Sequence, residues 1–201
     1  MEKASRRATE RSQIREAEER PKSLGRNNWL AAALYVLAAE GVAGVRVEKL
    51  ARLLGVTKGS FYWHFKNRKA LLRSLLDYWV EEMTDSVSRF VERIGGDPRS
   101  RLLALLEHIE FEGRNRYDPA MRAWAAFDET AAAVVKEVDE RRLRLVTQIF
   151  RDMGFSDTEA ALRGRMSYYY LVGEATVLIQ DSPADHWEFL RLRHRLLTHP
   201  I

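Results

Sequence analysis

Hydrophobic residues recur at intervals of three and four along most of this 201-residue chain. In the segment 27–41, Leu30, Leu34 and Leu37 fall on one helical face, and Gly41 stands where a helix commonly ends. No segment alternates apolar and polar residues as a half-buried strand does. The pattern therefore predicts an all-α fold.

Two short helices are expected within 47–65, and a long one from about residue 69 up to Gly95 and Gly96. Later helix starts are marked by capping residues. Asp97-Pro98 and Asp118-Pro119 each place an N-cap acceptor before a proline suited to the first helical position. The segment 156–159, SDTE, matches a capping box, and Ser182-Pro183 opens a last helix. About nine helices are expected, or ten if the first segment folds.

Charge divides the chain into two parts. Residues 1–70 hold 15 Lys and Arg against 7 Glu, a net charge of +8, whereas residues 71–201 hold 18 against 22 acidic residues, a net charge of −4. A cationic module favours a polyanionic partner. We expect a basic arm over 1–25, flexible or helical, whose arginines could reach a DNA groove, although solvated disorder is commoner for such a tail; these are Arg6, Arg7, Arg11 and Arg15. After the arm, we expect a DNA-binding domain over 26–70 and a larger domain over 71–201.

Composition excludes several classes of protein. The chain is 46% hydrophobic, lacks any apolar run long enough to span a membrane, and has a charged N-terminus, so a cytoplasmic location is expected. It has no cysteine, which excludes disulfides and thiolate catalysis. No phosphate-binding glycine loop or nucleophile elbow is found. No cofactor is expected.

The stretch VEKLARLLGVTKGSFYWHF, residues 47–65, reads as a helix-turn-helix. Gly55 supplies the corner, which needs a positive φ, and the small Ala51 lets the second helix approach. A shared core is predicted from Leu50, Leu54, Val56 and Phe61. Thr57 is the expected N-cap of the second helix, so Lys58, Gly59 and Ser60 form its first turn, where amide groups meet phosphates.

Five residues at the end of this stretch carry four aromatic rings and an imidazole. Phe61 and Phe65 are four apart and share the inner face. Tyr62, Trp63 and His64 point elsewhere, with donors for phosphates and flat surfaces for a thymine methyl group. For Trp63 and His64, packing against the first helix, in the segment 27–41, is an equal alternative.

Residues 50–72 resemble the DNA-binding signature of the TetR family of bacterial transcriptional regulators, A-x-x-x-G-V-[ST]-x-G-x-[LF]-Y-x-[HY]-F-x-x-[KR]-x-x-L. Arg68 replaces the usual lysine and keeps its charge. Arg46 stands where a hydroxyl residue often caps the helix, which puts that cap in doubt, and Lys69 replaces a frequent acid. The predicted DNA-binding residues are Arg46, Thr57, Lys58, Gly59, Ser60, Tyr62, Trp63, His64, Arg68 and Lys69.

The resemblance implies a homodimeric repressor that reads a palindromic operator, with half-sites roughly 34–36 Å apart, and is released by a small effector. It also implies that the helix from about Arg68 to Arg93 moves on effector binding. The effector is expected to be largely apolar, with candidate contacts at Trp79, Met83, His108, Phe111, Trp124, Phe127 and Tyr169.

A four-helix dimer interface is expected from two apolar stripes in the C-terminal helices. The first comprises Leu162, Met166, Tyr169 or Tyr170, Gly173 and Val177, and the second Trp187, Leu190, His194 and Leu197. The alternative is that these stripes belong to a monomer core.

Two other functions are weighed against this one. His108 and Glu112 are spaced to share a helix face, and His186 and His194 lie in one helix. Neither pair gives three metal ligands at a recognised spacing, so neither a metal site nor an enzyme is expected. A DNA-binding protein of the same fold controlled by a protein partner, or by no ligand, stays open as the alternative.

Overall fold

The protein is described here from a computed structural model that covers residues 24–113, 115–178 and 182–200. Most of the predicted arm, including its arginines at 6, 7, 11 and 15, lies outside these residues. Every regular element in the described part is helical, as predicted. No helix in this part is both long enough and apolar enough to cross a bilayer.

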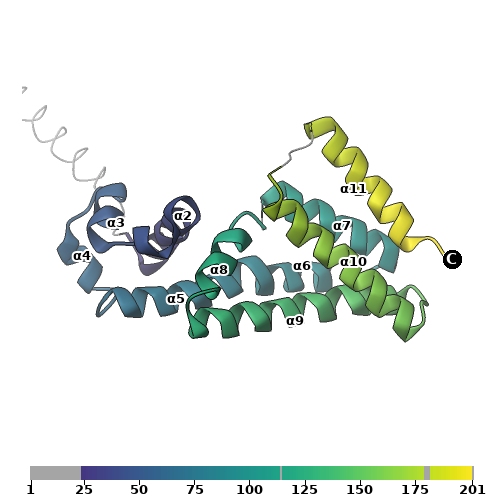
Figure 1. Cartoon of the computed structure of the whole chain (residues 1–201), viewed down its shortest axis with the longest axis horizontal. Helices are drawn as coiled ribbons and strands as arrows, with labels where there is room; N and C mark the ends of the chain where they lie inside the picture. Colours follow the sequence, from purple (N-terminus) through teal and green to yellow (C-terminus); the bar gives the residue numbers. More distant parts are fainter. Residues whose placement is uncertain (1–23, 114, 179–181, 201) are drawn as a thin grey trace, which may run out of the picture.

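The helices form a small head, a connecting rod and a body (Figure 1). The head contains α2 (Arg26–Gly44), α3 (Val47–Leu53) and α4 (Lys58–Tyr62). The rod consists of α5 (Arg68–Val80), a π-helical turn (Glu81–Asp85, hereafter the π-turn) and α6 (Ser86–Ile94). The body contains α7 (Pro98–Glu112), α8 (Asp118–Ala125), α9 (Glu129–Asp152), α10 (Asp157–Thr176) and α11 (Pro183–Thr198).

Most of the predicted helix ends are found in the structure. Gly41 has a φ of 69° and interrupts α2, and Gly95, with a φ of 58°, ends α6. Asp97 accepts a hydrogen bond from the Ser100 amide at 3.0 Å. Ser156 and Glu159 form the predicted capping box, and Ser182 accepts a bond from the Asp185 amide.

Two predictions about helices need correction. Asp118 is the first residue of α8 rather than its N-cap, and its buried carboxylate pairs with Arg142 instead of capping the helix. The rod is helical over the predicted length but is not regular, because the π-turn lies in its middle, where the Ser86 amide donates to the Glu81 carbonyl five residues earlier.

Two apolar cores stabilise the molecule. The first joins the head to α5 and continues into α8 and the first half of α9, through residues such as Trp29, Phe61, Leu75, Trp79 and Met121. The second joins α6, α7, the end of α9, α10 and α11. The rod helix α5 therefore packs as part of the head, while α6 packs as part of the body, and the π-turn lies at the change from one to the other.

Candidate nucleic-acid interface and cavity

The helix-turn-helix has the internal packing that the sequence predicts. Gly55 adopts a φ of 67°, and the following Val56 amide donates to the Ala51 carbonyl at 3.0 Å. Leu50, Ala51 and Phe61 are buried, and Leu54 and Val56 pack against them partly buried. This small core fixes the angle between α3 and α4.

A chain of aromatic contacts anchors α4 to α2. The Phe61 ring meets the Trp29 ring edge-on at 5.4 Å and stacks on the Phe65 ring at the same centroid distance. Phe61 and Phe65 are therefore core residues, as predicted, and they hold the outer side of α4 away from the rest of the head.

Tyr62 and Trp63 project from the head into solvent. Tyr62 is 63% exposed and Trp63 is 89% exposed. Packing of Trp63 against α2, the alternative weighed above, is therefore excluded. The His64 side chain is half-buried beside the Phe65 ring, with the two centroids 6.4 Å apart.

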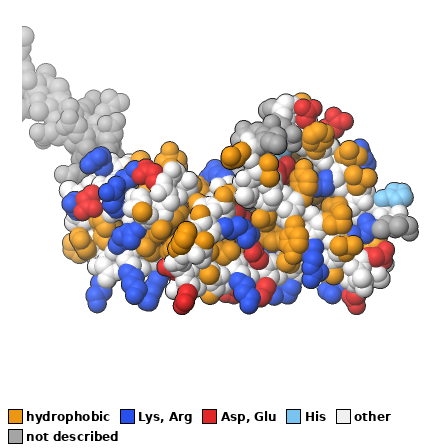
Figure 2. Space-filling model, in the orientation of Figure 1, with side chains coloured by type: hydrophobic (Ala, Val, Ile, Leu, Met, Phe, Trp, Pro, Cys, Tyr) orange, Lys and Arg blue, Asp and Glu red, His pale blue; other side chains and the backbone are white. Residues whose placement is uncertain are grey.

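Lys and Arg side chains are exposed on the head, as they are along the body (Figure 2). Of the predicted DNA-binding residues, Arg46, Thr57, Lys58, Gly59, Arg68 and Lys69 are exposed, whereas Ser60 is half-buried. Thr57 occupies the N-cap position of α4, but its side chain makes no capping bond. A Cβ at Gly59 would meet Thr57 Oγ1 at an ordinary 3.6 Å, so the head itself does not require glycine there.

Arg68 has a structural role that sequence reasoning did not assign. Its Nε donates to the Val45 carbonyl at 2.6 Å and its Nη2 to the Val42 carbonyl, so the guanidinium caps the end of α2. The N-cap of α5 is Asn67, whose Oδ1 accepts from the Ala70 amide at 2.9 Å. An asparagine directly before an amphipathic run was the signal for this cap. Arg46 provides no side-chain cap for α3, which agrees with the doubt raised about that position.

Glu48 is a further residue of this surface that the sequence did not suggest. Its carboxylate lies 2.9 Å from the Nζ atom of Lys58, which is the first residue of α4. The hydrogen bond from Lys58 lowers the pKa of Glu48 below its ordinary value. The lysine at the start of α4 is therefore paired within the head.

The comparisons with known proteins agree with this geometry. The family model described as "Bacterial regulatory proteins, tetR family" matches residues 30–75, which contain the helix-turn-helix. Residues 30–75, which form most of the head and the first part of the rod, thus match the DNA-binding domain of the TetR family of bacterial transcriptional regulators. The relatives and the fold of the TetR family are those of a DNA-binding regulator rather than an enzyme.

Individual TetR-family proteins resemble the chain over different lengths. It is 44% identical over 64 residues to the class A tetracycline repressor protein of Escherichia coli, which is 31% of this chain and 30% of that protein. It is 29% identical over 80 residues to the regulator YerO of Bacillus subtilis, which is 40% of this chain and 28% of YerO. Each match thus spans less than a third of the relative's own length. The fold as a whole resembles a regulator from Rhodococcus sp. Rha1, with a TM-score of 0.63, 24% identity and coverage of 87% of this chain and 94% of that one.

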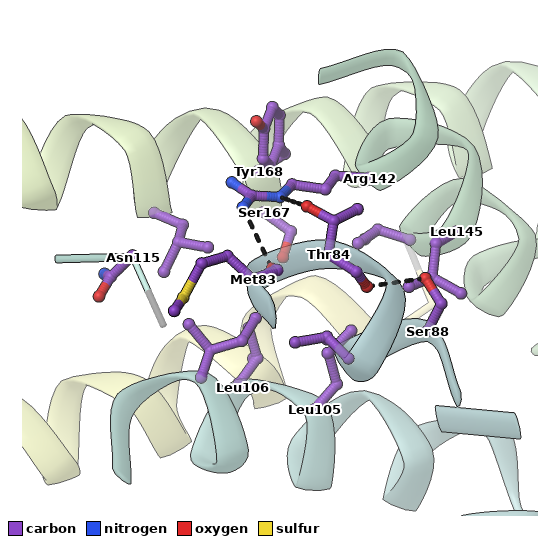
Figure 3. A pocket seen from close by; sticks show the side chains of 14 residues that line it. Met83, Thr84, Ser88, Leu105, Leu106, Asn115, Arg142, Leu145, Ser167 and Tyr168 are labelled. Carbon is purple, nitrogen blue, oxygen red and sulfur yellow. Dashed lines mark hydrogen bonds between the residues drawn. The ribbon is translucent and has the colours of Figure 1, made fainter. Parts of the chain in front are cut away.

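The body contains a cavity between the π-turn, α6, α7, α9 and α10 (Figure 3). Its walls are mostly apolar, and its volume is about 40 Å³. The lining comprises Met83, Thr84, Val87, Ser88, Leu105, Leu106, Ile109, Asn115, Arg142, Leu145, Val146, Ser167, Tyr168 and Leu171.

The structure does not gather the seven residues expected to contact an effector. Of these, Met83 alone lines the cavity. Trp79 and Trp124 belong to the core that joins head and body. Three others are exposed on the surface, namely Phe111, Phe127 and Tyr169. His108 stacks on Phe90 at 3.9 Å in a shallow surface groove beside Phe111. The structure therefore does not bring the seven residues together at one site, and their contact with an effector stays a prediction. Apolar side chains from α6, α7, α9 and α10 form the cavity walls.

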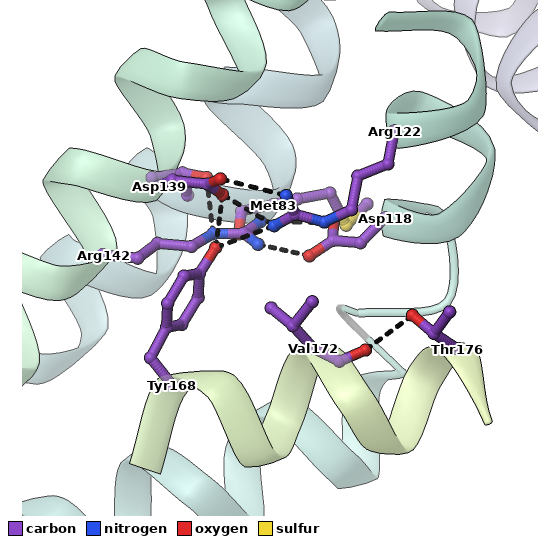
Figure 4. A network of polar contacts seen from close by, with 9 residues as sticks. Met83, Asp118, Arg122, Asp139, Arg142, Tyr168, Val172 and Thr176 are labelled. Atoms are coloured by element: carbon purple, nitrogen blue, oxygen red, sulfur yellow. Dashed lines mark hydrogen bonds and ion pairs between the residues drawn. The ribbon is translucent and has the colours of Figure 1, made fainter. Parts of the chain in front are cut away.

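Arg142 joins the cavity to a network of charged groups (Figure 4). Its guanidinium pairs with Asp118 of α8, and its Nε donates to Thr84 Oγ1 at 3.2 Å. Burial by itself would lower the pKa of Arg142, but the charge and hydrogen bonds of Asp118 outweigh burial and raise it. The arginine is thus charged and neutralised locally by a buried carboxylate.

A second ion pair lies beside the first. Arg122 donates to both carboxylate oxygens of Asp139, at 2.9 and 2.7 Å, and the Tyr168 hydroxyl donates to Asp139 at 2.6 Å. Burial opposes ionisation of Asp139, but these bonds prevail and lower its pKa. Burial raises the pKa of Tyr168 to about 12, and its bond to Asp139 adds to the effect. Helices α8, α9 and α10 are joined by this second pair.

Apolar side chains are exposed on the outer faces of α10 and α11. On α10 the predicted stripe is accessible at Leu162, Met166, Tyr169, Tyr170 and, just after the helix, Val177. The stripe expected on α11 needs correction. Leu190 and Leu197 are buried in the body core, and His194 Nε2 lies 2.9 Å from the Arg99 carbonyl, so that face points inward. The outer face of α11 instead carries Phe189, Leu192 and Leu196.

Proposed function

We propose that the protein is a homodimeric repressor that acts in the cytoplasm on a palindromic operator and is released by a small, apolar and uncharged effector. The observation that carries this proposal is the exposure of Tyr62 and Trp63 on the helix that follows Gly55. Large aromatic side chains that are exposed next to each other, on a helix that follows a helix-turn-helix corner, are typical of an interaction surface.

The surroundings of these rings fit a DNA backbone. Lys58 and Lys69 are also exposed, and residues 1–70 carry a net charge of +8. A helix-turn-helix places its second helix in the major groove, where a tyrosine hydroxyl and an indole N–H reach phosphates or base edges. The absence of a side chain at Gly59, which the head does not require, suits a close approach of the backbone to the duplex.

The exposed apolar faces of α10 and α11 support the homodimer. Met166 and Tyr169 on α10 and Leu192 and Leu196 on α11 are all more than a third exposed. Apolar side chains at helical spacing on two neighbouring helices are what a symmetric four-helix interface buries. Two heads related by a dyad would then read the two halves of a palindrome.

The charges around the cavity support an uncharged effector. Arg142 is the one cationic group among the cavity residues, and Asp118 already neutralises it. An anionic ligand would have to displace this buried carboxylate and leave it unpaired, which is costly. The remaining walls offer Leu105, Leu106 and Leu145 to an apolar molecule.

One observation favours a second candidate function. The cavity volume of about 40 Å³ is far below that of typical ligand sites, which measure roughly 300–1,000 Å³. A regulator of the same fold controlled by a protein partner, or by no ligand, needs no cavity. Thermal unfolding in a panel of neutral apolar compounds separates the two candidates, because a ligand that binds the folded chain raises its Tm.

Selection of duplexes from a random pool by the purified full chain, followed by footprinting, tests the DNA-binding function. We expect a protected palindrome, with affinity that falls steeply as salt rises. Tyr62→Ala should remove the protection, while Tyr35→Ala, which alters a tyrosine of similar exposure on α2, should keep it. Failure of the wild-type chain to select any sequence would contradict the proposal.

A further inference from the structure

The surface groove beside Phe111 is separate from the cavity and from the exposed apolar faces of α10 and α11. It lies where α7 packs between α6 and α11 (Figure 1). The groove has a volume of about 640 Å³, within the range of small-molecule sites, roughly 300–1,000 Å³. Its lining includes Phe90 of α6, Glu107, His108 and Phe111 of α7, and Trp187 and Arg191 of α11.

Helix α7 separates the groove from the cavity. Leu106 and Ile109 line the cavity, whereas Glu107 and Phe111 line the groove. With about 100° of rotation per residue, these two pairs lie on nearly opposite faces of the helix. His108 and Phe111, which the sequence suggested as effector contacts, therefore belong to a surface that the cavity does not share.

Four of the side chains that line the groove carry rings. The Phe90 and His108 rings stack face to face, with their centroids 3.9 Å apart and their planes inclined by 16°. Phe90 and Trp187 also pack against the second apolar core, which fixes their positions. Phe111 is 82% exposed, so its ring can lie over a bound molecule. A flat aromatic ligand suits such walls, because pairs of rings contribute beyond the area that they bury.

Two opposite charges also line the groove. Glu107 is half-buried and Arg191 is exposed, and among the described residues neither forms an ion pair, with the other or with a third group. The guanidinium of Arg191 can donate to a carboxylate, and the carboxylate of Glu107 can accept from an ammonium group. A ligand with a single charge would be attracted by one of these groups and repelled by the other. A zwitterion can pair with both.

We propose that the surface groove is a second ligand site, which binds a flat aromatic zwitterion such as an amino acid with an aromatic side chain. Phe111 and Trp187 contact the ring, Arg191 binds the carboxylate, and Glu107 binds the ammonium group. The site goes beyond the proposed function and does not depend on it, since none of its residues lines the cavity or belongs to the head. Because the groove is open, we expect a dissociation constant on the order of 0.1–1 mM.

Titration of the isotope-labelled full chain with L-tryptophan, followed by its amide NMR signals, tests the site. Two analogues separate the charged contacts, since tryptamine lacks the carboxylate and indole-3-propionate lacks the ammonium group. We expect the unsubstituted chain to bind L-tryptophan about tenfold more tightly than either analogue, because each analogue loses one charge-assisted contact. Absence of L-tryptophan binding at ten times the expected dissociation constant would overturn the proposal.

Charge variants assign the two polar contacts. In Arg191→Gln, L-tryptophan should lose its advantage over tryptamine, and in Glu107→Gln it should lose its advantage over indole-3-propionate, because each variant removes one partner of a pair. Arg195→Gln on α11 and Glu140→Gln on α9 alter exposed charges outside the groove and should change neither ratio. Unchanged ratios in both groove variants, or equal changes in the controls, would contradict the site.

Phe111→Leu tests the aromatic wall, because leucine keeps an apolar side chain without a ring. We expect L-tryptophan to bind this variant about fivefold more weakly. The matched control is Phe127→Leu, which alters a 95% exposed phenylalanine outside the groove and should keep full affinity. Both changes lie at the surface, so both chains should fold. Full affinity in Phe111→Leu would place L-tryptophan elsewhere on the protein and refute the proposed site.

Discussion

Lys58 Nζ, at the start of α4, lies 2.9 Å from Glu48 Oε1 in the first turn of α3. Both side chains are more than half exposed, so the pair is accessible from the face that carries Tyr62 and Trp63. A carboxylate at this position repels phosphates and competes with them for the lysine. The Glu48–Lys58 pair therefore reduces the free energy that a contact between Lys58 and a phosphate adds to DNA binding.

Replacing Glu48 with glutamine should strengthen binding to the selected duplex. We expect an affinity gain of about two- to fivefold at low salt, because an exposed ion pair is worth roughly 0.2–1 kcal/mol. The dependence of binding on salt should also steepen as Lys58 takes up a phosphate. Fluorescence anisotropy at several salt concentrations measures both effects.

Glu137→Gln is the control for this change, since it removes one acid from an exposed Glu–Arg pair on α9, in the body. It should leave affinity unchanged. Equal or weaker DNA binding by Glu48→Gln would mean that Lys58 does not contact DNA.

Trp63→Ala should weaken DNA binding without destabilising the fold. The ring is 89% exposed, so its removal costs little packing. A single good side-chain contact to DNA is worth about 1–3 kcal/mol, so we expect a loss on the order of tenfold. Phe127→Ala, which removes a 95% exposed ring from the body, should alter neither affinity nor Tm. If the Trp63→Ala chain bound DNA with full affinity, Trp63 would not be part of the DNA interface.

Met166→Arg and Leu196→Arg should each weaken the proposed homodimer. Both side chains lie on the outer apolar faces of α10 and α11, and a charge buried there without a partner opposes association. We expect the dimer dissociation constant to rise at least about tenfold, which equals 1.4 kcal/mol. Analytical ultracentrifugation measures it, with Phe127→Arg as the control. An unchanged dimer in both variants would place the interface elsewhere.

Local signals explain why the head was predictable. The corner at Gly55 and the spacing of Phe61 and Phe65 depend on neighbours within one or two helical turns. In the body, the capping box at the start of α10 likewise depends on two residues three apart, Ser156 and Glu159. Such features leave a mark in the sequence because the residues that form them are close along the chain.

The body was harder to predict because its decisive contacts are distant in sequence. Helix α11 has apolar residues on two faces, and only packing against α7 selects Leu190 and Leu197 as the inner ones. The cavity brings together residues from Met83 to Leu171, and no single helix contains its pattern. The π-turn depends on Arg142, more than fifty residues away. Sequence spacing therefore predicted the wrong α11 face and did not reveal the cavity walls or the π-turn.

Glu110→Gln should stabilise the protein at neutral pH. Glu110 Oε1 is buried without a hydrogen-bond partner among the described residues, while Oε2 lies 3.1 Å from His186 Nε2. Burial, together with the nearby charge of Glu174, raises the pKa of Glu110. Ionising this carboxylate is thus costlier in the folded chain than in the unfolded one. Glutamine removes that cost and keeps an acceptor for His186.

The sign of the pH dependence follows from the raised pKa. At a pH below the unfolded value, near 4.5, the carboxyl is protonated in both states and the cost is absent. As pH rises through the folded pKa, the wild type loses stability relative to Glu110→Gln. Urea unfolding should therefore give similar stabilities at pH 4 and a variant that is more stable at pH 7.5 by on the order of 1 kcal/mol, because the raised pKa of Glu110 penalises the ionised carboxylate only in the folded wild type. Glu140→Gln, at an exposed site on α9, should show no such difference. A Glu110→Gln chain that is less stable at pH 7.5 would mean that its bond to His186 outweighs the burial of its charge.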